Sequence, residues 1–142
     1  RLRAALDDVG AAATDVVLGP SNPFLSIAPI LDIPDMQGLL RHAARRVVAV
    51  SPIIGGQALK GPAGKIMSEL GLEVSATGWT HWMNEHYPGL VDVWVWDETD
   101  QQAADDLRAE GMDIRTTSTV MSDPERAAAF GDWLLRVCES DH

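Results

Sequence analysis

The segment VDVWVW, residues 91–96, carries the clearest indication of fold in this 142-residue sequence. β-Branched and aromatic residues make up most of it, which is typical of a β-strand. Trp94 and Trp96 alternate with Val93 and Val95, so we interpret the two tryptophans as side chains that pack on a face of a sheet.

Three further β-branched runs predict strands, at residues 15–18 (DVVL), 47–50 (VVAV) and 113–117 (DIRTT). Segments with helical spacing lie between these runs, and such alternation favours crossover units. The sequence therefore predicts an α/β, Rossmann-like fold with a mainly parallel sheet and helices on both faces. We expect residues 1–142 to form a single unit, because no repeat, low-complexity tract or linker interrupts the pattern.

Helices are predicted over residues 35–44, 63–70 and 99–110, and from residue 122 onward. Two of them begin with the spacing of a capping box, one at Thr99 and one at Ser122. In the last helix, Phe130 and Val137 recur on one face, which should pack on the sheet. Gly111 is placed to end the third helix.

The charge of the chain limits its partners. Asp and Glu number 21 against 11 Lys and Arg, a formal charge of -10. Such a chain repels polyanions, so we expect no nucleic acid partner. Phosphorylated small molecules remain compatible with this charge, because backbone amides and helix N-termini bind phosphate.

The single cysteine, Cys138, cannot form an intrachain disulfide or a thiolate cluster, which favours a reducing compartment such as the cytoplasm. We expect no membrane partner, since no apolar run approaches the ~20 residues of a membrane span. The sequence opens at Arg1 rather than Met, and residues 1–9 resemble the tail of a helix. We therefore expect a piece of a longer polypeptide.

Two loops of unusual composition follow the carboxyl ends of predicted strands. Parallel sheets bind ligands at this position. The first, residues 19–23 (GPSNP), follows the first predicted strand. Considered alone, its Ser21 and Asn22 fit better as residues that satisfy nearby backbone groups than as ligand contacts. The second loop, residues 51–65, follows the second predicted strand.

The second loop combines conformational freedom with positive charge. Gly55 and Gly56 permit close approach of the backbone to a ligand, and Lys60 and Lys65 add cations to an acidic chain. The pattern is neither a Walker A loop nor G-x-G-x-x-G. From the residues alone, an anion site and a structural turn remain equally open.

Other chemically suggestive residues favour structural roles. His81, Glu85 and His86 lack the spacing of a zinc motif. Asp97 and Glu98 follow a strand directly and could bind Mg²⁺, but carboxylates at that position more often cap a helix.

Among the remaining candidates, Trp79 and Trp82 could stack on a flat ligand, in contrast to the two strand tryptophans. Cys138 is interpreted as a small buried apolar residue.

The two loops together resemble a known family. Residues 16–31 (VVLGPSNPFLSIAPIL) and 47–71 (VVAVSPIIGGQALKGPAGKIMSELG) are similar to the C-terminal half of the 2-phospho-L-lactate transferase family, which acts in biosynthesis of coenzyme F-420. Residues 116–121 (TTSTVM) also resemble the family's last strand, and the similarity extends over most of residues 1–120.

The resemblance implies a transferase reaction. A phosphoenolpyruvyl or 2-phospholactyl group would pass from a guanosine-diphosphate-linked donor to the deazaflavin Fo, releasing GMP and forming (dehydro) coenzyme F-420-0. It further implies Mg²⁺ as cofactor and a cytoplasmic homodimer. The sequence does not distinguish the two donors, although actinobacterial members of the family are expected to use the enolpyruvyl form.

The resemblance also implies a set of substrate-binding residues, but no catalytic residue. The set is Gly19, Ser21, Asn22, Ser26, Ser51, Gly55, Gly56 and Lys60. The family's Gly-rich nucleotide loop and its acidic metal ligands belong to an N-terminal half that this sequence does not contain. We therefore expect 142 residues alone to be inactive.

Two other functions compete with the transferase. One is a non-catalytic regulator that binds a nucleotide or nucleotide sugar, of the gluconeogenesis-factor type. Those proteins tend to contain Gly-Pro-Gly-Ser where residues 19–23 contain Gly-Pro-Ser-Asn-Pro, which favours the transferase. The other is an α/β interaction domain in which both loops are structural.

Overall fold

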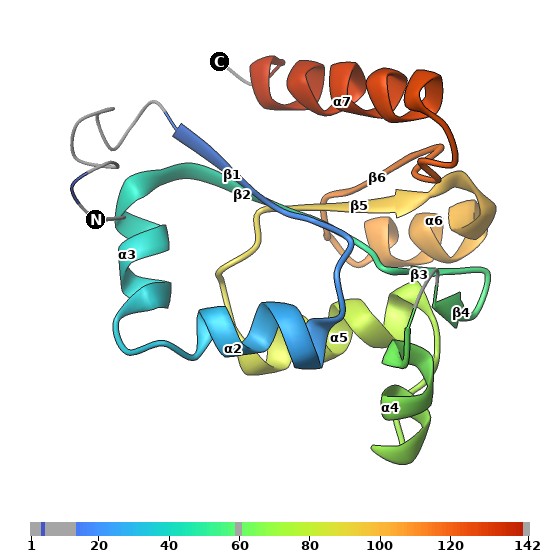
Figure 1. Ribbon diagram of the computed structural model, residues 1–142, viewed down its shortest axis with the longest axis horizontal. Coiled ribbons are helices and arrows are strands. Elements are labelled where there is room, and N and C mark those ends of the chain that lie inside the picture. Colours follow the sequence, from blue (N-terminus) through green and yellow to red (C-terminus); the bar gives the residue numbers. More distant parts are fainter. Residues whose placement is uncertain (1–3, 5–13, 59–60, 141–142) are drawn as a thin grey trace.

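The computed structural model describes residues 4, 14–58 and 61–140. Its main sheet has four strands in the order β1-β2-β5-β6, all parallel, which confirms the predicted α/β class (Figure 1). The strands are β1 (Thr14–Leu18), β2 (Ala44–Val50), β5 (Val93–Asp97) and β6 (Ile114–Thr117). Each predicted strand run corresponds to one of them.

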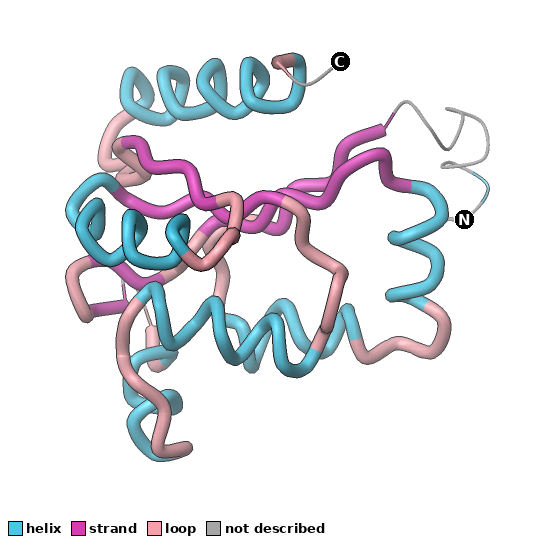
Figure 2. Tube along the Cα trace, turned by 180° about the vertical axis from the view of Figure 1, so that it is seen from behind, coloured by secondary structure: helices cyan, strands magenta, loops and turns pink. Residues whose placement is uncertain are grey.

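The helices divide unequally between the two faces of the sheet. Because the strand order advances in one direction, right-handed crossovers bring the connecting helices to the same face. These are α2 (Ala28–Leu31), α3 (Met36–Ala43), α4 (Ala63–Glu69), α5 (Ala76–His86) and α6 (Gln101–Ala109). Among the described residues, α7 (Pro124–Glu139) alone covers the opposite face, as Figures 1 and 2 show from two sides.

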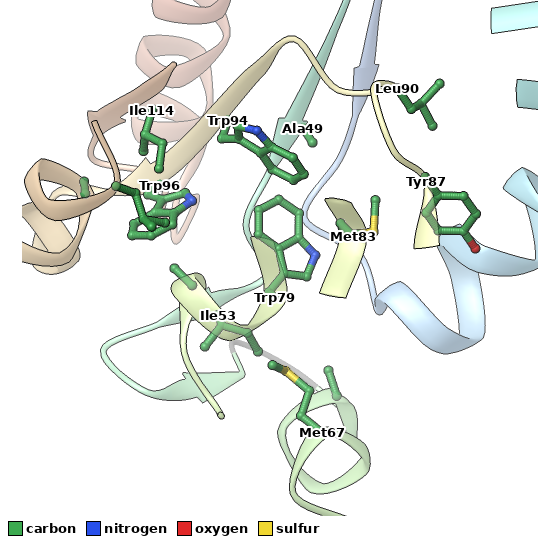
Figure 3. Close-up of a cluster of buried hydrophobic side chains, with 14 of the residues drawn as sticks. Ala49, Ile53, Met67, Trp79, Met83, Tyr87, Leu90, Trp94, Trp96 and Ile114 are labelled. Carbon is green, nitrogen blue, oxygen red and sulfur yellow. The ribbon is translucent and has the colours of Figure 1, made fainter. Parts of the chain in front are cut away.

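Alternate side chains of β5 point to opposite faces of the sheet and contribute to a hydrophobic core on each face. Trp94 and Trp96 face the crossover helices, where the ring of Trp79 meets Trp94 edge-on at 5.3 Å between centroids (Figure 3). Val93 and Val95 face α7. One strand thus supplies large side chains to the thick layer and small ones to the layer under a single helix.

Helix α7 begins at a different cap from the one predicted. Asp123, not Ser122, is the N-cap, and its Oδ1 accepts a hydrogen bond of 2.8 Å from the amide of Arg126. The predicted inward residues Phe130 and Val137 are buried against the valines of β2 and β5, as expected.

The third predicted helix is also preceded by a different cap. The side chain of Asp97 accepts from the amide of Thr99 and opens a 3₁₀ turn, η2 (Glu98–Asp100), before α6 begins. Thr99 is therefore not the cap, and the capping role expected for Asp97 is confirmed.

Two helical segments have no counterpart among the predicted helices. Residues after the first loop form a π-helical turn, η1 (Pro23–Ile27), that continues into α2. Helix α5 contains Gly78, two threonines and two tryptophans, which have modest helix propensity. Burial of Trp79 and Met83 against the sheet stabilises it, which local propensity does not reveal.

Within the described residues, no helix is both long and apolar enough to traverse a lipid bilayer.

Candidate functional site

A pocket of about 500 Å³ lies at the carboxyl edge of the sheet. The segments that follow β1, β2 and β6, together with the start of α4, form its walls. We call it the edge pocket, lined by Pro20, Asn22, Pro52, Ala63, Thr119, Val120, Met121 and Ser122. The position is the one at which parallel α/β sheets bind ligands.

Asn22 caps the helix that starts in the first loop. Its Oδ1 accepts hydrogen bonds from the amides of Phe24 at 2.9 Å and Leu25 at 3.0 Å. Its Nδ2 is buried and has no hydrogen-bond partner among the described residues. An unpaired buried donor is costly. Asn22 also lines the edge pocket.

Asp97 holds the part of the pocket wall that contains Thr119. One carboxylate oxygen accepts from the amide of Thr99 at 3.0 Å and its hydroxyl at 2.6 Å. The other accepts from the amide of Thr119 at 2.9 Å and its hydroxyl at 3.2 Å. Burial alone raises the pKa of this carboxyl, but the hydrogen bonds from Thr99 and Thr119 outweigh it and lower the pKa.

The glycine pair of the second loop makes a hairpin turn. Strands β3 (Ile53–Ile54) and β4 (Gln57–Ala58) pair antiparallel, and Gly55 and Gly56 join them with φ of 56° and 78°. Such left-handed angles at both central positions explain the glycines. The amide of Gly55 donates to Asp100 at 3.1 Å, so that amide already has a partner.

The other predicted ligand residues are placed as follows. The Ser51 hydroxyl is buried, donating to the Ile53 carbonyl and accepting from its amide. Ser21 and Ser26 are exposed, and the carbonyl of Gly19 accepts from the amide of Ser21 at 2.8 Å.

Lys60 lies outside the described residues. Of the predicted set, Asn22 is the described member that lines the edge pocket. The ligand-binding roles of the whole set stay predictions.

Thr119 and Ser122 were not predicted as site residues, although both line the edge pocket. They belong to the polar run after the fourth strand. Because the carboxyl ends of parallel strands meet at one edge, this run was a signal that could have found them.

The described residues do not fit a resident magnesium site. No group of three or more His, Cys, Asp or Glu among them could hold a metal ion. Both oxygens of Asp97 are occupied by threonine hydrogen bonds. The ring of His86 stacks on Trp82 at 4.4 Å between centroids.

The two tryptophans proposed to stack on a flat ligand serve the core. Trp79 is 4% exposed, so it does not have a face free for a ligand. Trp82 packs against Phe24 at 4.8 Å between centroids as well as against His86. The first loop is thereby fixed onto α5.

Comparison with known proteins identifies relatives. A family model described as 2-phospho-L-lactate transferase CofD matches residues 1–132. The 2-phospho-L-lactate transferase of Methanosarcina barkeri is 44% identical over 123 residues, which are 85% of this chain and 37% of that protein. The phosphoenolpyruvate transferase of Thermobifida fusca is 44% identical over 116 residues, 81% of this chain and 33% of that protein.

The phosphoenolpyruvate transferase of Streptomyces griseus is 33% identical over 135 residues, 94% of this chain and 41% of that protein. The chain thus spans between 33% and 41% of the length of these curated relatives.

Proposed function

The chain belongs to the 2-phospho-L-lactate transferase family, and from this we propose that the full-length protein is a transferase of coenzyme F-420 biosynthesis. It passes a phosphoenolpyruvyl or 2-phospholactyl group from a guanosine-diphosphate-linked donor to the deazaflavin Fo. Relatives named for each activity are equally similar, at 44% identity, so similarity does not favour either donor.

The edge pocket supports a role in holding the acceptor. Its volume of about 500 Å³ suits a ring system, and no described lining residue carries a charge. A diphosphate would require cations or several free amides, whereas a deazaflavin requires apolar walls and a few hydrogen-bond partners. Asn22 in this lining has a buried Nδ2 with no partner among the described residues, and the need of that donor for an acceptor is the observation that carries the proposal.

In the proposed reaction, a ribityl hydroxyl oxygen of Fo attacks the phosphorus that bears the enolpyruvyl or lactyl group. A new oxygen–phosphorus bond forms while the bond to the GMP phosphate breaks, and GMP leaves with the electron pair. The hydroxyl proton passes to solvent or to a base outside the described residues. This chain contributes positioning of the acceptor, which can account for much of the rate of a phosphoryl transfer.

Mg²⁺ and a homodimeric assembly belong to the same proposal. The described residues supply no metal site, so the ligands would come from elsewhere in the full-length protein. Activity with and without a chelator, and the molecular mass in solution, test these two points.

Binding of Fo tests the proposal most directly. Fo is intrinsically fluorescent, so it can be titrated into the full-length protein, with and without GDP and Mg²⁺. Saturable binding is expected, and no binding would overturn the transferase. Release of GMP from each of the two donors then identifies the transferred group. A protein that binds the donor but never releases GMP would be the regulator instead.

A further inference from the structure

Asp97 connects segments that lie far apart in the sequence. It ends β5, is 4% exposed, and does not itself line the edge pocket. Its two oxygens serve different segments, the 3₁₀ turn at Thr99 and the pocket wall at Thr119. The carboxylate therefore joins the end of one strand to the segment that follows the neighbouring strand.

The turn bound to Asp97 also reaches the second loop. Asp100 in that turn accepts the amide of Gly55 at the tip of the β3–β4 hairpin. The Cβ that a side chain at Gly55 would add lies 3.6 Å from Cγ2 of Thr99. One short turn is thus bound on one side to the hairpin and on the other, through Asp97, to the wall of the edge pocket.

We propose that Asp97 is a positioning residue for the edge pocket. By accepting both the amide and the hydroxyl of Thr119, it sets where Thr119–Ser122 lie in the lining that they share with Asn22. The nature of the bound ligand, Fo, rests on the function proposed above. The position of the wall does not.

Asp92 provides a matched control at the other end of β5. Its Oδ2 accepts the amide of Val47 at 2.8 Å, so it also joins two neighbouring strands. Asp92 precedes β5 and lies at the amino edge of the sheet, away from the edge pocket. Its loss should weaken the fold without moving the wall.

The test compares Asp97→Asn and Asp92→Ala in the full-length protein. An asparagine offers one oxygen, so either Thr99 or Thr119 loses its acceptor and faces an NH₂ group. We expect Asp97→Asn to raise the Kd for Fo and the KM at least about tenfold, with a smaller change in kcat. Amide hydrogen exchange of residues 119–122 should accelerate. Asp92→Ala should leave the Kd for Fo, the KM and the exchange of residues 119–122 unchanged. This should hold even if urea unfolding shows that it loses as much stability as Asp97→Asn.

A second pair keeps the test decisive if Asp97→Asn does not fold. Thr119→Val removes one hydrogen bond to Asp97 at nearly constant volume, whereas Thr119→Ser keeps it. The valine variant should show weaker Fo binding and faster exchange in residues 119–122. The serine variant should keep the wild-type Fo affinity and the wild-type exchange rate.

The outcomes separate the two proposals. Equal exchange rates in residues 119–122 for Asp97→Asn and Asp92→Ala, or for the two Thr119 variants, would overturn the positioning role. Failure of the wild-type protein to bind Fo would instead contradict the proposed function, and the exchange measurement would still decide the role of Asp97.

Discussion

The two polar atoms of the Asn22 side chain differ in their hydrogen bonding. Its Oδ1 caps a helix, so part of the local interpretation of the first loop is confirmed. Its Nδ2 is buried without a partner among the described residues, in a side chain that lines the edge pocket. The sequence suggested the residue, but whether it served the fold or a ligand depended on the partners of each atom.

This division selects the informative variant at position 22. Asn22→Asp keeps the capping oxygen but replaces the Nδ2 donor with an acceptor. We expect its free energy of unfolding to fall by about 1 to 3 kcal/mol, because the second carboxylate oxygen is buried without a donor, while Fo binding weakens about tenfold or more. Asn22→Ala should lose binding and also about 1 kcal/mol of stability, because the cap is gone. Urea unfolding and Fo titration measure the two effects, and unchanged binding by both variants would remove Asn22 from the site.

Tyr87 gives a pH prediction that one titration checks. Burial, and then the hydrogen bond from its hydroxyl to Asp32 at 2.9 Å, raise its pKa to about 12. The folded state favours the neutral phenol, so this stabilisation is complete below the ordinary pKa near 10 and is lost as pH rises toward about 12. Tyr87 is the single tyrosine. Its ultraviolet absorbance should titrate near 12 when folded and near 10 in urea, and equal midpoints would contradict the prediction.

Helices α3 and α5 carry a glycine at the same position, the third residue, but in different surroundings. Gly78 in α5 donates its amide to the N-cap Ser75, and a Cβ there would lie 2.0 Å from the carbonyl oxygen of Glu73. Gly38 in α3 has no heavy atom from outside its own stretch of helix within 4 Å of the corresponding point. The same substitution should therefore have opposite effects in the two helices.

We expect Gly78→Ala to destabilise the protein by at least about 2 kcal/mol, because backbone must move at the start of a buried helix. Gly38→Ala should be neutral or stabilising by up to about 1 kcal/mol, since alanine favours the helix. Urea unfolding of both variants measures this difference. Similar values for the two would show that α5 begins differently from the structure described here.

For the molecule as a whole, the two cores differ in thickness. Within the described residues, five helices pack on one face of the sheet, and α7 alone covers the valines of the other (Figure 1). The C-terminal part of α7 is bound to β2, because the Arg46 side chain of β2 donates to the Val137 carbonyl at 3.1 Å. The second core therefore depends on few large side chains.

Phe130 is the largest buried side chain beneath α7, at 4% exposure. Phe130→Ala should lower the free energy of unfolding by roughly 3 kcal/mol or more. The control is Leu135→Ala, because Leu135 is on the same helix but is 62% exposed. This substitution should lower the free energy of unfolding by at most about 0.5 kcal/mol. Urea unfolding of the 142-residue chain tests both. A small effect at Phe130 would mean that α7 is not essential to this face.

Much of the fold was predictable because its signals are local. All four strands of the main sheet follow from β-branched runs, and the alternation in β5 correctly assigned Trp94 and Trp96 to packing on the sheet. Helix α5 was not predictable in this way. Its buried Trp79 is stabilised by contact with Trp94, and no pattern within the helix encodes that contact.

The residue types of strands and loops alone predicted the α/β class and a mainly parallel sheet, which the structure confirms, because periodicity and turn chemistry act over a few neighbouring residues. The edge at which a ligand would bind stays a prediction. Tertiary contacts determined the pocket itself. The glycines of the second loop became a hairpin turn, whereas Thr119, brought to the pocket wall by Asp97, did not stand out in sequence. Which polar groups remain free for a ligand depends on which ones folding has already paired, and those partners are distant along the chain.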